Sequence, residues 1–156
     1  MEIERKWLVK PEKIPYDLGA LEQMRIEQSY VSFWPTIRIR KINGGQFVLT
    51  VKTSPENGGG LSRNEYEFPL SEAEYESLER QRKGNIIAKT RYLHRIGQLT
   101  EEIDIFSGAL EGLAYLEIEF PDEQSAQSYP SPSWVEKDVT FDNRYKNSAL
   151  AEKGMP

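Results

Sequence analysis

The chain has 156 residues, of which 38% are hydrophobic and 29% are charged, and its 20 lysines and arginines against 25 aspartates and glutamates give a formal net charge of -5. Because it contains no cysteine and a single histidine, disulfides, thiolate nucleophiles and histidine-rich metal sites are excluded. The acidic balance also argues against a uniformly basic face that binds nucleic acid.

The sequence shows no sign of membrane insertion or export. No apolar run approaches the roughly 18 residues that a membrane helix needs, and the charged N-terminus does not resemble a signal peptide. We therefore expect a cytoplasmic protein with neither a membrane nor a nucleic acid as partner. No internal repeat, low-complexity tract or linker divides the sequence, so we expect residues 1–156 to form one domain.

Alternation of apolar and polar residues predicts a chain built mainly of strands. The predicted strands lie at residues 2–9, 26–33, 36–42, 46–53, 63–69, 87–95, 100–106, 114–120 and 138–141. An Asn-Gly-Gly sequence at residues 43–45 predicts a hairpin turn, and the glycine-rich stretch at residues 55–60 predicts a longer flexible loop. Ser71 followed by Glu74 resembles a capping box that opens a helix. Helices are predicted at residues 71–84, 122–128 and 144–153.

The charged residues of these strands segregate by sign. They alternate with apolar residues, and within almost every strand they carry one sign. The acidic pairs are Glu65 with Glu67, Glu102 with Asp104 and Glu117 with Glu119; the basic residues are Arg38, Arg40, Lys52, Lys89 and Arg91; and the first strand carries Glu2, Glu4 and Lys6. The solvated face of an antiparallel sheet is the usual explanation of alternating charge. Such a face would intersperse the two signs, however, because like charges at positions i and i+2 repel one another.

Segregated charges suggest two kinds of ligand. Paired carboxylates suit a divalent cation, and paired arginine and lysine side chains suit a polyanion. Both demands meet in a phosphate chain bridged to Mg²⁺ or Mn²⁺. For the polar faces to point inward, the sheet must close into a barrel, with its apolar faces outside under the helices. The alternation alone leaves both this arrangement and an open, solvated sheet as interpretations.

The N-terminal pattern Glu-x-Glu-x-Lys at residues 2–6 resembles the hallmark of the CYTH family, the triphosphate tunnel metalloenzymes. Further matching motifs are Ile-Arg-Ile-Arg at 37–40, Leu-Thr-Val-Lys at 49–52, Gly-Gly-Leu-Ser-Arg at 59–63, Glu-Tyr-Glu at 65–67, Lys-Thr-Arg-Tyr at 89–92, Glu-Ile-Glu-Phe at 117–120 and Arg-Tyr-Lys-Asn at 144–147. The first pattern alone is weak, because three charged residues recur by chance. The ordered series, which spans nearly the whole chain, is a strong signal.

The resemblance implies a mainly β (α+β) fold: a closed antiparallel eight-stranded β-barrel tunnel with a polar, charged interior and helices packed outside. It also implies two Mg²⁺ or Mn²⁺ ions in the active complex. The metal ligands it implies are Glu2, Glu4, Asp104, Glu117 and Glu119. The residues it implies for triphosphate binding are Lys6, Arg38, Arg40, Lys52, Lys89, Arg91, Arg144 and Lys146. Lys6 is also the expected catalytic residue, which would orient the attacking water or stabilise developing charge.

Several roles stay open at this point. Glu65, Glu67 and Glu102 fit either metal ligands or structural partners of the basic strands. The motif at residues 144–147 resembles the family's closing segment, the last stretch of the tunnel. Either Arg144 or Lys146 could be its residue that reaches the substrate. Tyr30 is a further candidate for the tunnel lining.

The short chain narrows the expected activity. Family members with little beyond the tunnel resemble inorganic tripolyphosphatases, so we expect hydrolysis of tripolyphosphate to pyrophosphate and phosphate, with nucleoside triphosphatase as a side activity. Thiamine triphosphatase and class IV adenylate cyclase share the tunnel motifs and stand as alternatives. A module that binds polyphosphate without turnover is the alternative outside enzymes. The sequence leaves open the preferred metal, the physiological triphosphate and whether two chains form a homodimer.

Overall fold

The computed structural model describes residues 1–54 and 61–156, so the loop expected at residues 55–60 lies outside the described residues. Within the described part of the chain, nine strands form one sheet in the order β5-β4-β3-β2-β6-β7-β8-β1-β9. The strands are β1 (Glu2–Leu8), β2 (Glu22–Ser32), β3 (Thr36–Ile42), β4 (Gln46–Thr53), β5 (Ser62–Leu70), β6 (Lys83–Ile96), β7 (Leu99–Ser107), β8 (Ala114–Glu119) and β9 (Lys137–Asp138).

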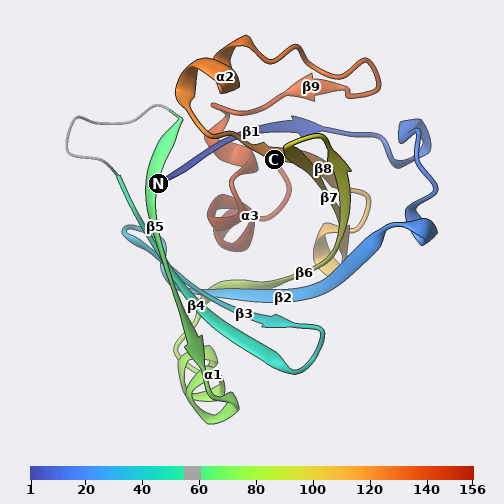
Figure 1. Cartoon of the computed structure of the whole chain (residues 1–156). Helices are drawn as coiled ribbons and strands as arrows, with labels where there is room; N and C mark the ends of the chain where they lie inside the picture. Colours follow the sequence, from blue (N-terminus) through green and yellow to red (C-terminus); the bar gives the residue numbers. More distant parts are fainter. Residues whose placement is uncertain (55–60) are drawn as a thin grey trace.

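Strands β1 to β8 close into a barrel, seen from one end in Figure 1. Closure comes from β1, whose Glu2 and Ile3 pair antiparallel with Arg63 and Ser62 of β5. The rest of β1 pairs with β8 along one edge, and its last two residues pair with β9 along the other. All neighbouring strands are antiparallel. The closed eight-stranded antiparallel barrel confirms the predicted mainly β fold.

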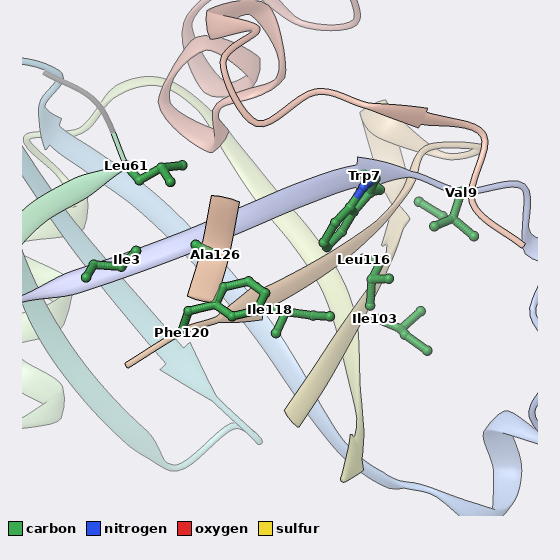
Figure 2. Packing of buried hydrophobic residues seen from close by; sticks show 10 residues of the cluster. Ile3, Trp7, Val9, Leu61, Ile103, Leu116, Ile118, Phe120 and Ala126 are labelled. Carbon is green, nitrogen blue, oxygen red and sulfur yellow. The ribbon is translucent and has the colours of Figure 1, made fainter. Parts of the chain in front are cut away.

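The apolar faces of the strands point outward, as the barrel hypothesis requires. Trp7 is fully buried on the outer side of β1, where it packs in one cluster with outward residues of β7 and β8 and with Ala126 of α2 (Figure 2). The cluster consists of Ile3, Trp7, Val9, Leu61, Ile103, Ala114, Leu116, Ile118, Phe120 and Ala126. Because successive side chains on a strand face opposite sides, this outer core directs the charged residues between them into the barrel.

The helices cover the barrel in two ways. α1 (Glu72–Glu79) and α2 (Glu123–Ser128) lie outside the wall, and the predicted capping box is present at Ser71 and Glu74. α3 (Asn147–Lys153) instead packs at one end of the barrel, where Leu150 meets the inward-facing Tyr30 and Tyr115. Short 3-10 turns lie at Pro11–Lys13, Leu18–Ala20, Gly108–Leu110 and Asn143–Tyr145. None of the described helices is long and apolar enough to cross a lipid bilayer.

Strand pairing moves some of the predicted boundaries. β2 begins at Glu22 and β6 at Lys83, both earlier than predicted, because these two strands pair with each other over almost their whole length. The first helix accordingly ends at Glu79 rather than at Gly84. Gly84 has a φ of +73°, and a Cβ there would overlap the carbonyl oxygen of Ala151 in α3. The glycine thus permits the close approach of α3 to β6.

Candidate functional site

Two adjoining cavities occupy the barrel interior. The first chamber has a volume of about 510 Å³, and its charged lining residues are Glu2, Glu4, Arg38, Arg40, Lys52, Glu65, Glu67, Arg91, Glu102, Glu117 and Glu119. The second chamber has a volume of about 440 Å³, and its charged lining residues are Glu4, Lys6, Arg38, Lys52, Arg63, Asp142 and Lys146. The chambers meet at Glu4, Arg38 and Lys52, which line both. The charged faces that the sequence separates strand by strand therefore converge on one interior space.

Three of the residues singled out in the sequence line neither chamber. Lys89 and Asp104 are fully buried in the barrel, below the chamber walls. Arg144 is exposed, and its Nε and Nη2 donate to the carboxylate of Asp142 at 3.0 and 2.7 Å. Of the two residues in the closing segment, Lys146 is thus the one that borders a chamber.

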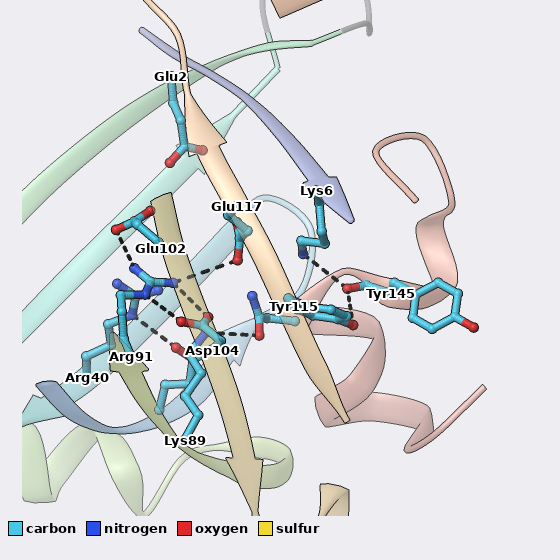
Figure 3. A network of polar contacts seen from close by, with 12 residues as sticks. Glu2, Lys6, Arg40, Lys89, Arg91, Glu102, Asp104, Tyr115, Glu117 and Tyr145 are labelled. Carbon is cyan, nitrogen blue, oxygen red and sulfur yellow. Dashed lines mark hydrogen bonds and ion pairs between the residues drawn. The ribbon is translucent and has the colours of Figure 1, made fainter. Parts of the chain in front are cut away.

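Asp104 stands at the centre of a buried ion-pair cluster (Figure 3). Arg91 donates to both of its oxygens, through Nε at 2.7 Å and Nη2 at 2.9 Å, and Lys89 Nζ lies 2.6 Å away. Burial alone would raise the pKa of Asp104, but Arg91 and Lys89 outweigh it and hold the pKa well below its usual range. Arg91 also donates to Glu102 at 3.1 Å. Both oxygens of Asp104 are therefore already engaged by cations.

A second group of carboxylates lies on β1 and β8, where the side chains face one another. Glu4 and Glu119 are directly opposite in the antiparallel pairing, as are Lys6 and Glu117. Burial and then the charge of Glu117 raise the pKa of Glu4 to about 8. Oε1 of Glu117 is buried without a hydrogen-bond partner among the described residues, 3.7 Å from Arg91 Nη2. Like charges directly opposite on neighbouring strands are destabilising, so this cluster would gain from a cation.

Glu2 has a partner of its own. Lys52 Nζ donates to Glu2 Oε1 at 2.8 Å and lies 3.5 Å from Glu65 Oε2. Burial alone would raise the pKa of Glu2, but Lys52 lowers it to about 2. Burial and the neighbouring Glu2 raise the pKa of Glu65 to about 7. Glu65 thus shares one lysine with Glu2, while Glu67 accepts a hydrogen bond from the Thr50 hydroxyl at 3.3 Å.

The chemistry of these carboxylates fits a hard divalent cation, although the side chains are not close enough together to coordinate one ion. Among residues 1–54 and 61–156, no three acidic or histidine side chains converge as a ready-made metal site. Glu2 is ion-paired with Lys52 of β4 instead. Glu4, Glu117 and Glu119 supply the oxygen ligands that Mg²⁺ and Mn²⁺ prefer, and their mutual repulsion is relieved by positive charge.

Two arginine side chains on β3 are also incompletely satisfied. Arg38 is 4% exposed, yet its Nε has no hydrogen-bond partner in the described structure. Burial, then Arg38 and Arg91, lower the pKa of Arg40 to about 10. The side-chain oxygen of Gln28 accepts from Arg40 Nε at 3.0 Å, and Arg40 lines the first chamber. Crowded guanidinium groups with unused donors are suited to an anion with several oxygens.

Lys6 is held by the closing segment of the chain. Its Nζ donates to the backbone carbonyl of Tyr145 at 3.1 Å and lies 4.6 Å from the ring centroid of Tyr115. The Tyr115 hydroxyl donates to the same carbonyl at 2.7 Å (Figure 3). Lys6 therefore occupies a fixed position in the second chamber, beside Glu4.

Sequence reasoning missed four residues that shape the interior. Arg63 lines the second chamber, Asn147 lines both chambers, Gln28 orients Arg40, and Tyr115 anchors the carbonyl that holds Lys6. Arg63 shares the inward phase of Glu65 and Glu67, so the alternation could have revealed it. The other three are uncharged: Gln28 and Tyr115 lie on strands, where their contacts depend on register, and Asn147 depends on how α3 packs at the end of the barrel.

Comparisons with known proteins agree with this architecture. The family model of the CYTH domain matches residues 1–144. An inorganic triphosphatase of Nitrosomonas europaea is 38% identical over 156 residues, which is 96% of each chain. An inorganic triphosphatase of Acetivibrio thermocellus is 36% identical over 97% of this chain and 93% of its own. A crystal structure of an inorganic triphosphatase superposes with a TM-score of 0.68 at 33% identity, covering 97% of this chain and 94% of that one. The chain therefore belongs to the CYTH domain family.

Proposed function

We propose that this protein is a metal-dependent hydrolase that cleaves inorganic tripolyphosphate into pyrophosphate and orthophosphate in the cytoplasm. The observation that carries the proposal is one barrel interior lined by carboxylates and cationic side chains together, in which Glu117 Oε1 and Arg38 Nε make no hydrogen bond among the described residues. Two relatives named inorganic triphosphatase, each similar over nearly its full length, support this choice of substrate.

For the phosphate chain, we propose that Arg38, Arg40 and Lys52 make the direct contacts. Guanidinium groups bind phosphate oxygens in a bidentate manner, and lysine supplies compact charge. Arg91 borders the first chamber and joins them. Lys89 and Asp104 lie too deep to line the chamber, so their proposed role is to hold Arg91 in place.

We propose Glu4, Glu117 and Glu119 as the metal ligands. Glu2 would join them when Lys52 exchanges its ion pair with Glu2 for a contact with phosphate. Mg²⁺ or Mn²⁺ suits this all-oxygen set, and a pair of ions is the arrangement that best serves phosphoryl transfer. When bound, the ions would neutralise the phosphate chain and lower the pKa of a water molecule that attacks the terminal phosphorus. Asp104 is a less favourable ligand, because both of its oxygens are occupied by Arg91 and Lys89.

The chain's own residues would then position the reacting groups. Lys6 Nζ, fixed by the Tyr145 carbonyl, would orient the attacking water or stabilise negative charge that develops as the phosphoanhydride bond breaks. Arg38 and Arg40 would keep the phosphate chain in line with the water and bind the pyrophosphate that leaves. Water adds to the terminal phosphorus, the bridging oxygen departs with pyrophosphate, and the proton of the water ends on bulk solvent or on the orthophosphate product.

A screen of triphosphates with Mg²⁺ and with Mn²⁺ tests the proposal. We expect tripolyphosphate to yield equal amounts of orthophosphate and pyrophosphate, with slower release from nucleoside triphosphates. Preferred hydrolysis of thiamine triphosphate, or formation of a cyclic nucleotide with pyrophosphate, would point to the two alternative enzymes. Tight binding with no product under any condition would indicate a binding module.

A further inference from the structure

One end of the first chamber has an apolar lining. Four neighbouring strands, β2 to β5, each contribute one apolar side chain to it, and we call this set the apolar rim: Met24, Ile42, Val48 and Pro69. Ile42 is the last residue of β3 and Val48 is the third of β4, so the rim lies beside the turn that joins these strands. The charged lining of the chamber therefore gives way to apolar side chains at this end.

The proposed chemistry directs the leaving group toward the apolar rim. Lys6, proposed to act at the attacked phosphorus, lines only the second chamber, whereas Arg38 lines both chambers and Arg40 lines only the first. A phosphate chain that extends from Lys6 past Arg38 to Arg40 therefore has its pyrophosphate end at Arg40. The next inward residue on β3 is Ile42, about 7 Å further along the strand.

The apolar rim suits an organic group better than it suits another phosphate. Burying a charge against apolar side chains is unfavourable, whereas a planar ring gains free energy when its faces leave water for side chains such as Met24 and Val48. Phe68 lines the same end of the chamber and is 51% exposed, so an aromatic side chain is available to a ring. Gln46 is exposed there too, and its amide can donate to and accept from the polar edge of a ring.

We propose that the apolar rim binds the planar ring of an organic triphosphate, such as the base of a nucleoside triphosphate, while the phosphate chain occupies the charged chambers. This inference rests on the proposed triphosphatase function, and it adds the place of the organic group to it. The terminal phosphate of such a substrate reaches Lys6, and the ring stays beyond Arg40. Inorganic tripolyphosphate leaves the rim empty, so the side chains of the rim affect organic triphosphates alone.

The methyl NMR signals of the methionines locate the ring in the full chain. The chain has three methionines: Met24 in the rim, Met155 in a separate cavity that shares lining residues with the second chamber, and the exposed Met1. Spectra are recorded with Mg²⁺ and one of two hydrolysis-resistant compounds, methylene-bridged inorganic triphosphate or adenosine triphosphate with a methylene bridge between its β and γ phosphorus atoms. Met24→Leu and Met155→Leu assign the signals.

We expect the nucleotide analogue to shift the Met24 signal well beyond any change that the inorganic analogue causes, because an aromatic ring lies beside that methyl group. Met1 and Met155 should respond alike to the two compounds. A shift of Met155 that only the nucleotide analogue causes would place the ring at the opposite end of the barrel and overturn the proposal. Equal responses of Met24 to the two compounds would overturn it as well.

Two valines of β4 provide a matched test of affinity by calorimetry with the same two compounds. Val48 belongs to the rim, whereas Val51 faces the outside of the barrel and lines neither chamber. We expect Val48→Ser to raise the Kd of the nucleotide analogue about threefold to tenfold and to change the Kd of the inorganic analogue less than about twofold. Val51→Ser should leave both affinities unchanged.

The remaining outcomes separate this proposal from the proposed function. An unchanged affinity of Val48→Ser for the nucleotide analogue, or equal losses for the two compounds, would refute the ring site. The NMR experiment on the parent chain decides the matter if thermal unfolding shows that Val48→Ser is unfolded. A parent protein that binds both analogues but hydrolyses no triphosphate refutes the proposed function alone. One that hydrolyses tripolyphosphate but does not bind the nucleotide analogue refutes the ring site alone.

Discussion

Replacing Asp104 by asparagine separates a structural carboxylate from the carboxylates proposed to bind metal. Asp104 and Lys89 are fully buried, and three contacts of 2.6 to 2.9 Å join the carboxylate to Lys89 and Arg91. Asp104→Asn would leave buried Lys89 without the one carboxylate that the structure records beside it, and Arg91 would keep only its weaker contacts to Glu102 and Glu117. Breaking a buried ion pair in this way costs about 3–5 kcal/mol of folding free energy.

Urea unfolding of the metal-free protein in EDTA, followed by tryptophan fluorescence, measures this cost. Glu119→Gln is the matched control, because Glu119 is an exposed carboxylate on the same barrel for which the structure records no ion pair. We expect the control to lie within about 0.5 kcal/mol of the parent protein. If Asp104→Asn were as stable as Glu119→Gln, the assignment of Asp104 as a structural ion-pair partner would be refuted.

The same comparison has a pH dependence of known sign. Because the pKa of Asp104 is lower in the folded protein than its ordinary value of 3.8, its stabilisation is fully present above that pH and is lost as the pH falls below it. The stability difference between the parent protein and Asp104→Asn should therefore shrink in acid as the pH falls below 3.8. A difference that grew on acidification would contradict the ion-pair explanation.

Three further predictions concern catalysis. Glu4→Gln and Glu119→Gln should each abolish turnover while the fold survives, and full activity of both at limiting Mg²⁺ would remove them from the metal site. Lys6→Ala should lower kcat on the order of 10²–10³-fold, whereas Arg38→Ala should mainly raise KM. Steady-state kinetics on tripolyphosphate measures both constants. A normal kcat for Lys6→Ala would mean that this lysine only binds substrate. The Tyr115 hydroxyl and Lys6 both donate to the Tyr145 carbonyl, and Tyr115→Phe removes the first of these contacts. We expect kcat to fall by about threefold to tenfold with KM unchanged. A changed KM with a normal kcat would argue against this positioning role.

Alternation of charge was sufficient to predict which side chains enter the barrel, because the side-chain period of a strand is independent of its neighbours. It could not predict which inward residues lie at the same level. That Arg91 stands opposite Asp104, and Lys6 opposite Glu117, follows from strand register, which depends on turns and pairing along the whole sheet. The ion pairs of Asp104 were therefore beyond reach of the sequence, although both partners were identified as inward residues.

Strand-by-strand segregation of charge has two physical consequences in a closed barrel, and only one of them concerns a ligand. Some opposite charges satisfy each other, as Lys52 of β4 does with Glu2 of β1, and as Arg91 does with Asp104 on the neighbouring strand β7. Such pairs balance charge within the folded barrel and say little about its function. Other buried groups stay without a hydrogen bond among the described residues: Oε1 of Glu117, whose nearest cation is Arg91 at 3.7 Å, and Nε of Arg38. Leaving buried polar groups unsatisfied costs stability, so their presence on both sides of one interior space is best explained by a ligand that carries both signs, a phosphate chain with its metal.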